Sequence, residues 1–167
     1  MNIIDYFKKL DDNTEETLSQ AKSYSAEQLA FKGEGNWTVM QLLEHIVLTE
    51  KVCLFILLRP TDKLAATSEI FGQKKLDAFL LNPNGPKFNA PEMLQPKGDI
   101  QDVATFEKDF VAERNLLKQK IEAGEIVIDN HTHKHPALGE MTISDWLYFD
   151  ILHTQRHLAQ IKRMLAE

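Results

Sequence analysis

Four long stretches of this chain repeat apolar side chains at steps of three and four residues, the spacing that places them on one face of an α-helix. They cover residues 2–30, 36–60, 102–123 and 142–166, and a break near 23–25 is expected to kink the first helix. Helices of this length bury their apolar faces by packing against one another. The sequence therefore predicts an all-α protein, and specifically a four-helix bundle.

The ends of two helices carry clear capping signals. Thr38 followed by Gln41, and Thr142 followed by Asp145, each place a hydroxyl and a longer polar side chain at the spacing of a capping box. Pro60 marks the end of the second helix, because proline cannot continue one. These signals set the predicted boundaries.

The connections between the helices predict the topology. About forty residues separate the second and third helices, and a structureless loop of that length is unusual, so we expect one or two short helical turns within 68–81. A long crossover allows two consecutive helices to run parallel, which predicts an up-down-down-up bundle. The segment 125–128, "EIVI", could form a short extended piece. With no repeats and no boundary, residues 1–167 are predicted to form a single domain.

Composition narrows the classes of function. The formal net charge of −6 and the pI of about 5.5 argue against a nucleic-acid partner, which needs clustered Lys and Arg. The charged start has no signal-peptide pattern, and no apolar run is long enough to span a membrane. The single cysteine, Cys53, excludes an internal disulfide and fits a reducing compartment. We therefore expect a cytoplasmic protein without a membrane or nucleic-acid partner.

Histidines on two inward helix faces are the main candidates for chemistry. In "DILHTQRHLAQI", His153 and His157 lie about 40° apart around the helix and about 6 Å apart along its axis. This i, i+4 spacing lets one helix supply two ligands to a metal ion. His45 occupies the apolar face of the second helix, at a depth that is compatible with either helix direction. Three histidines with one open position are typical of a catalytic divalent-metal site.

Two other interpretations stay open. Buried histidines can be core residues whose nitrogens bond within the protein, although three unpartnered imidazoles would cost about 1–3 kcal/mol each. A rival cluster, His131, His133 and His135, lies in "HTHKHP", where an extended backbone would point all three to one side. For this polar segment a solvated loop is the preferred interpretation.

Several neighbours of the histidines are candidate supporting or pocket residues. Asp150, three residues before His153, and Gln160, three after His157, could accept the far N–H of a ligand histidine. A surface charge is the preferred interpretation of Asp150, and a surface ion pair that of Arg156, although Arg156 could also meet an anionic substrate.

Other polar and aromatic residues near these faces are assigned to the framework. Glu44 lies about 100° from the His45 face and is not predicted to be a ligand. Cys53 is interpreted as a core residue rather than a nucleophile. Trp37 and Trp146 are interpreted as core residues, although either could border the pocket.

Three quoted segments resemble one family. They are "NWTVMQLLEHIVLTE", "FNAPEMLQP" and "HPALGEMTISDWLYFDILHTQRHLAQI", and together they make nearly the whole chain resemble the DinB-like superfamily, near its bacillithiol- and mycothiol-dependent transferase branch. The resemblance implies a divalent ion, zinc or nickel, held by His45, His153 and His157, and frequent homodimers. It also implies a small-molecule substrate, in characterised relatives a low-molecular-weight thiol.

The function that follows is a hypothesis with an alternative. A divalent ion on three neutral histidines would activate a thiol for S-transfer or a water molecule for hydrolysis, and the ligands do not choose between them. No general base beside the histidines is evident from the sequence. The alternative is a non-catalytic metal- or ligand-binding bundle that acts as a dimeric interaction or sensor module.

Overall fold

Long helices account for most of the chain. The computed structural model describes residues 1–33 and 35–166, and within them four helices have 20 residues or more. The predicted all-α class is confirmed for the body of the protein, to which the structure adds a small two-stranded sheet. The long helices are α1 (Ile3–Ser23), α3 (Val39–Leu58), α5 (Val103–Glu122) and α6 (Ile143–Leu165).

The shorter elements lie in the connections. The helix α2 (Ala26–Ala30) follows the break that the sequence predicts near 23–25, and it has its own capping box from Ser25 and Gln28. The crossover between α3 and α5 contains α4 (Gly72–Leu80) and the 3₁₀ turn η1 (Glu92–Leu94). Strands β1 (Thr132–His135) and β2 (Gly139–Thr142) form an antiparallel hairpin before α6.

The predicted capping boxes are confirmed at both helices that matter for the site. The Thr38 hydroxyl accepts the backbone N–H of Gln41, whose side chain accepts the N–H of Thr38 in return. Thr142 and Asp145 make the same reciprocal pair at the start of α6. These caps fix where α3 and α6 begin, and therefore the depth at which their histidines lie.

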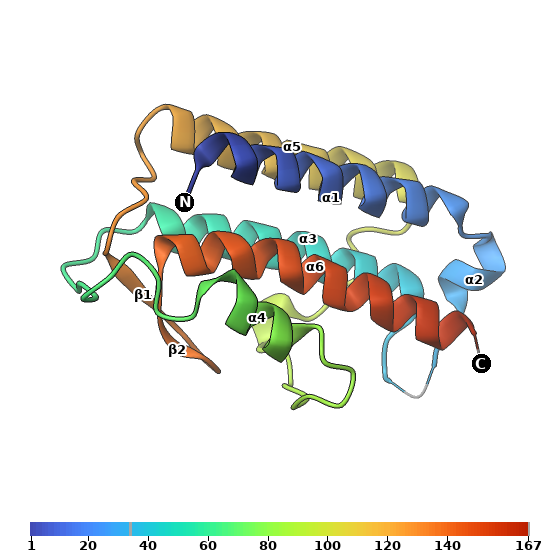
Figure 1. Cartoon of the computed structure of the whole chain (residues 1–167). Helices are drawn as coiled ribbons and strands as arrows, with labels where there is room; N and C mark the ends of the chain where they lie inside the picture. Colours follow the sequence, from blue (N-terminus) through green and yellow to red (C-terminus); the bar gives the residue numbers. More distant parts are fainter. Residues whose placement is uncertain (34, 167) are drawn as a thin grey trace.

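The four long helices pack in two layers of two. In Figure 1, α1 and α5 lie side by side above α3 and α6, and contacts join α1 to α5 and α6, and α3 to α5 and α6. The chain runs along α1 and α6 in one direction and along α3 and α5 in the other. The crossover makes this arrangement possible, since it carries the chain back along the length of the molecule before α5 begins.

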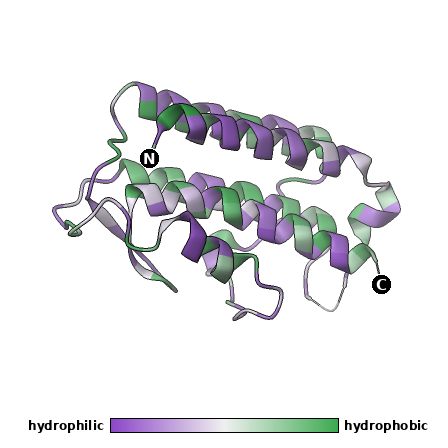
Figure 2. Ribbon diagram, viewed as in Figure 1, coloured by the Kyte–Doolittle hydropathy of each residue, from purple (hydrophilic) through white to green (hydrophobic). Residues whose placement is uncertain are grey.

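The hydrophobic core is divided into two clusters, one toward each end of the helices. Each long helix contributes to both clusters, so apolar residues follow the helices along their inner faces in Figure 2. Between the two clusters each helix places buried polar side chains. They include Asn13 and Thr17 on α1, Thr49 and Glu50 on α3, Arg114 on α5, and Asp150 and Thr154 on α6.

The crossover is attached to α6 through one buried carboxylate. Asp145 accepts the backbone N–H groups of Ile70, Phe71 and Gly72 at 2.9–3.2 Å, in addition to capping α6. Gly72 has φ +75°, a left-handed conformation that side chains rarely adopt, and it lets the chain turn into α4 at this point. The helix α4 then packs along α6.

The segment before α6 differs from its prediction. Residues 125–128 form no strand; the extended backbone lies later, in the hairpin of residues 132–135 and 139–142. The hairpin is held to α6 by Trp146, whose indole N–H donates to the carbonyl of His133 at 3.1 Å. Polar residues dominate both strands, so the alternation of apolar and polar residues that reveals a strand is weak there.

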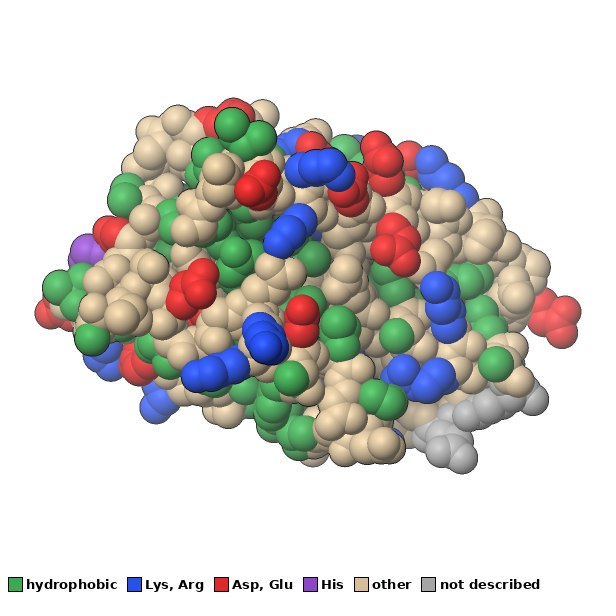
Figure 3. Space-filling view, in the orientation of Figure 1, with side chains coloured by type: hydrophobic (Ala, Val, Ile, Leu, Met, Phe, Trp, Pro, Cys, Tyr) green, Lys and Arg blue, Asp and Glu red, His purple; other side chains and the backbone are tan. Residues whose placement is uncertain are grey.

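The outer surface mixes charges of both signs. On the face shown in Figure 3, basic and acidic side chains alternate, with smaller hydrophobic groups between them. No helix in the described part of the chain has the length and apolar character needed to cross a lipid bilayer.

We predict that Asp145→Ala destabilises the protein by about 3 kcal/mol, because it leaves backbone N–H donors without their charged acceptor and removes a helix cap. Chemical denaturation measures the effect. The matched control is Asp62→Ala, an exposed carboxylate, for which we expect a change within about 0.5 kcal/mol. Equal stabilities of the two variants would contradict this account of the crossover.

Candidate metal centre

The three histidines singled out from the sequence converge in the structure. Their Nε2 atoms face one another: His153 Nε2 lies 3.2 Å from that of His45 and 3.1 Å from that of His157. His45 is buried, whereas His153 and His157 are partly accessible to solvent. The cluster therefore combines one buried histidine on α3 with two partly exposed histidines on α6.

Hydrogen bonds at the far nitrogens set the protonation of two of these rings. His45 Nδ1 lies 2.7 Å from the carbonyl oxygen of Leu94, which can only accept, so Nδ1 carries the proton. His157 Nδ1 lies 2.8 Å from Gln160 Oε1, which is likewise an acceptor. In their neutral forms both rings then present an Nε2 lone pair to the centre of the cluster.

This arrangement fits a divalent cation. With lone pairs on the Nε2 atoms of His45 and His157, His153 has at most one N–H to donate, so only one of the two Nε2–Nε2 contacts can be a hydrogen bond. Ligand nitrogens at 2.0–2.1 Å from a tetrahedral zinc ion lie about 3.3 Å apart, close to the observed contacts. A cation would accept all three lone pairs at once.

Burial keeps the histidines neutral. Loss of solvent lowers the pKa of His45, lowers that of His153 well below its usual value, and lowers that of His157 to about 3. Repulsion between the rings adds to the effect for His153 and His157. At neutral pH the nitrogens therefore need not lose a proton before they bind a metal ion.

Glu44 has a role that the sequence did not reveal. As predicted, it does not belong to the histidine cluster. Its buried carboxylate accepts the backbone N–H groups of Lys97, Gly98 and Asp99 at 2.9–3.2 Å. It thus holds the crossover against α3 just after η1, whose last residue, Leu94, supplies the acceptor for His45.

The supporting residues proposed from the sequence have different outcomes. Gln160 contacts His157 as the spacing suggests. Trp146 is buried against Phe149 and His135 rather than against the three clustered histidines. Arg156 donates to the carbonyls of Leu80 and Pro86, so the preferred interpretation of a surface ion pair is wrong within the described residues.

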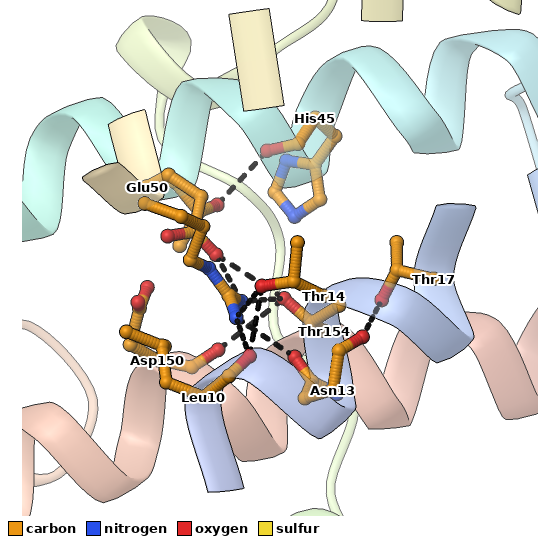
Figure 4. Close-up of polar contacts among 10 residues, drawn as sticks. Leu10, Asn13, Thr14, Thr17, His45, Glu50, Asp150 and Thr154 are labelled. Carbon is orange, nitrogen blue, oxygen red and sulfur yellow. Dashed lines mark hydrogen bonds and ion pairs between the residues drawn. The ribbon is translucent and has the colours of Figure 1, made fainter. Parts of the chain in front are cut away.

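The preferred interpretation of Asp150 as a surface charge is wrong. It is only 2% exposed, so it is not a surface charge, and it forms no hydrogen bond with a histidine in the described chain. Its carboxyl group lies with Glu50 and Cys53 in a polar layer between the two halves of the core (Figure 4). Spacing alone placed it near His153, but its side chain turns toward α3 and α5.

A buried ion pair forms the centre of that layer. Arg114 on α5 is paired with Glu50 on α3 and also donates to Asn13 on α1 and Thr154 on α6, so that all four long helices meet there (Figure 4). Burial, followed by the charge of Glu50, raises the pKa of Asp150 well above its usual value. The surroundings therefore favour the protonated form of Asp150 beside the Arg114–Glu50 pair.

Cys53 belongs to the same layer. It is buried, as predicted for a core residue, and burial, followed by the neighbouring carboxyl groups of Asp150 and Glu50, raises the pKa of its thiol well above the usual value. The thiolate is the reactive form of cysteine, so these surroundings suppress nucleophilic chemistry at Cys53.

The rival histidine cluster does not assemble. The solvated-loop interpretation is wrong, since His133 and His135 lie in β1, while His131 pairs with Asp129 at 2.9 Å. Among the described residues, only His45, His153 and His157 bring three ligand-type side chains together as a metal site requires. His135 instead packs its ring on Phe149 and Trp146.

Fold and site together define a helical protein in which three histidines, able to hold a metal ion, converge from two antiparallel helices. A sequence profile described as the DinB superfamily matches residues 9–161, and the chain belongs to that family. The chain is also similar to the uncharacterized protein YuaE of Bacillus subtilis (strain 168), with 26% identity over 150 residues, covering 89% of this chain and 90% of that protein.

We predict that Asp150→Asn stabilises the protein at pH 7 by about 1 kcal/mol or more, because the folded state holds a proton that the unfolded chain releases above pH ~4. The native pKa is raised, so wild-type stability declines as the pH rises from ~4 toward that pKa, and asparagine removes the decline. Chemical denaturation at several pH values measures the free energy of unfolding, with Asp62→Asn as the exposed control. A constant difference between wild type and variant from pH 3 to 8 would show that folding does not raise the pKa of Asp150.

Proposed function

We propose that this protein is a divalent-metal-dependent enzyme whose ion, zinc or nickel, is held by His45, His153 and His157. The observation that carries the proposal is the convergence of three Nε2 atoms, two of which present lone pairs because their Nδ1 protons are already bonded. Membership of the DinB superfamily supports it. The reaction we favour is S-transfer from a low-molecular-weight thiol, with hydrolysis by activated water as the variant that uses the same site.

The residues of the chain have separate tasks in this proposal. When bound, a divalent ion lowers the pKa of a thiol or water molecule at its open position. Three neutral histidines preserve the full charge of the ion, while Leu94 and Gln160 fix the orientation of two of them. The partial exposure of His153 and His157 leaves the approach for a small-molecule substrate on the α6 side.

Further features stay proposals. We propose that the four long helices form the up-down-down-up bundle of the resemblance and that two copies associate as a homodimer. A cytoplasmic location, and the absence of nucleic-acid and membrane partners, stay predictions from composition.

We predict about one zinc or nickel ion per chain in protein purified without an affinity tag, and none in the triple variant His45→Ala, His153→Ala, His157→Ala. Elemental analysis measures the content. The matched control is the double variant His131→Ala, His133→Ala, which removes histidines outside the cluster and should keep the ion.

Circular dichroism of the triple variant shows whether it remains helical, so that loss of metal is not mistaken for loss of fold. A wild-type protein that takes up neither ion after incubation would overturn the metal proposal and favour a binding or sensor module. Metal binding without thiol-dependent or hydrolytic turnover would support the metal site and contradict the proposal that the protein is an enzyme.

We predict that Gln160→Leu weakens metal binding about 10- to 100-fold, because His157 loses the acceptor that fixes its tautomer. Competition with a chromophoric chelator measures the affinity. Gln155→Leu, on the same helix but without a hydrogen bond to a histidine in the described chain, is the control. Unchanged affinity in Gln160→Leu would show that the contact does not position His157.

A further inference from the structure

A fourth histidine, His135 of β1, packs against the stripe of α6 that carries His153 and His157. The ring of His135 packs edge-on against Phe149 with 4.8 Å between ring centroids, and Phe149 lies 5.6 Å from His153. Phe149 precedes His153 by four residues, a rise of about 6 Å along the helix. His135 is therefore about one helical turn from the metal cluster, brought there by the hairpin and not by α6 itself.

The hairpin fixes which nitrogen of His135 carries the proton. Its Nδ1 accepts the backbone N–H groups of Ala137 and Leu138 at 3.0 and 3.1 Å, so the proton of the neutral ring is on Nε2. Burial lowers the pKa of His135 to about 4, which keeps the ring neutral near pH 7. The hydrogen bond from Trp146 to the His133 carbonyl holds the strand in place on α6.

The Nε2–H of this ring is a donor without an acceptor. Within the described residues it forms no hydrogen bond, although the side chain is half-buried between aromatic rings. If this position needed only an acceptor to close the hairpin turn, asparagine would serve equally well, because asparagine is common in turns. Because Nε2 is not among the buried atoms that lack a partner, it is open to the surroundings, and a ligand that binds beside Phe149 can supply its acceptor.

We propose that His135 is a substrate-binding residue, which donates its Nε2–H to a carboxylate or carbonyl oxygen of a ligand whose other end binds the metal ion. The inference rests on the proposed metal-dependent function and narrows its substrate class to small thiols that carry an oxygen acceptor two or three bonds from the sulfur-bearing carbon. Phe149, between the two anchoring points, would contact the aliphatic part of such a ligand.

The experiment compares two thiols on the cobalt(II)-substituted protein, whose thiolate charge-transfer absorption reports binding at the metal. The probes are 3-mercaptopropionate, which has a carboxylate, and 1-propanethiol, which lacks it. We expect His135→Asn to lower the affinity for 3-mercaptopropionate about tenfold and to leave the affinity for 1-propanethiol unchanged. Asparagine keeps an acceptor for the turn, and the cobalt content, together with the thermal midpoint, verifies that site and fold persist.

The control is His133→Asn, which removes the other histidine of β1 and should alter neither affinity. If His135→Asn binds both thiols as the wild type does, His135 has only its turn-closing role, and the proposal is overturned while the metal site stands. If the wild type binds cobalt but neither thiol, both the thiol chemistry and the role of His135 fail. If it does not bind cobalt, the metal proposal itself fails, so the three failures are distinguishable.

Discussion

The pairing of Arg114 with Glu50 is the interaction on which the arrangement of the long helices depends. Both side chains are almost completely buried, at 2% and 4% exposure, so neither charge has water to replace its partner. Such a pair adds little net stability over a well-packed apolar core, but loss of one partner is costly because it leaves the other charge unpaired. The bonds from Arg114 to Asn13 and Thr154 extend this constraint from α5 and α3 to α1 and α6.

The polar layer also sets the position of the histidines. On α6, His153 and Thr154 are adjacent and project about 100° apart, so that one reaches the histidine cluster while the other reaches Arg114. On α3, the Thr49 hydroxyl donates to the carbonyl of His45, and Glu50 is the next residue along the helix. A shift of α3 along its axis would break the ion pair, and a shift of α6 would break the hydrogen bond between Arg114 and Thr154. Either shift would also separate His45 from His153 and His157.

Local patterns predicted those features that depend on one helix at a time. The caps at Thr38 and Thr142, and the i, i+4 histidines of α6, need only a regular helix, and His45 needed only its place on an apolar face. The burial of Asp150 was missed because the neighbours of its carboxyl group, Glu50 and Cys53, belong to another helix. The role of Glu44 was missed because its partners, residues 97–99, lie more than 50 positions away in sequence. The hairpin was missed because its strands are polar, although Gly139, with φ +78°, is the kind of residue that marks such a turn.

The neighbouring residues Glu44 and His45 both form hydrogen bonds with the crossover. The Glu44 carboxylate accepts three backbone N–H groups of the crossover, and the Nδ1–H of His45 donates to a carbonyl of the same crossover. The docking of this long connection on α3 and the orientation of the His45 ring therefore depend on the same stretch of backbone. If the crossover were detached from α3, the helices alone would leave the His45 ring free to turn its other nitrogen toward His153 and His157. Any ion held by His45 would therefore depend on the crossover as well as on the helices.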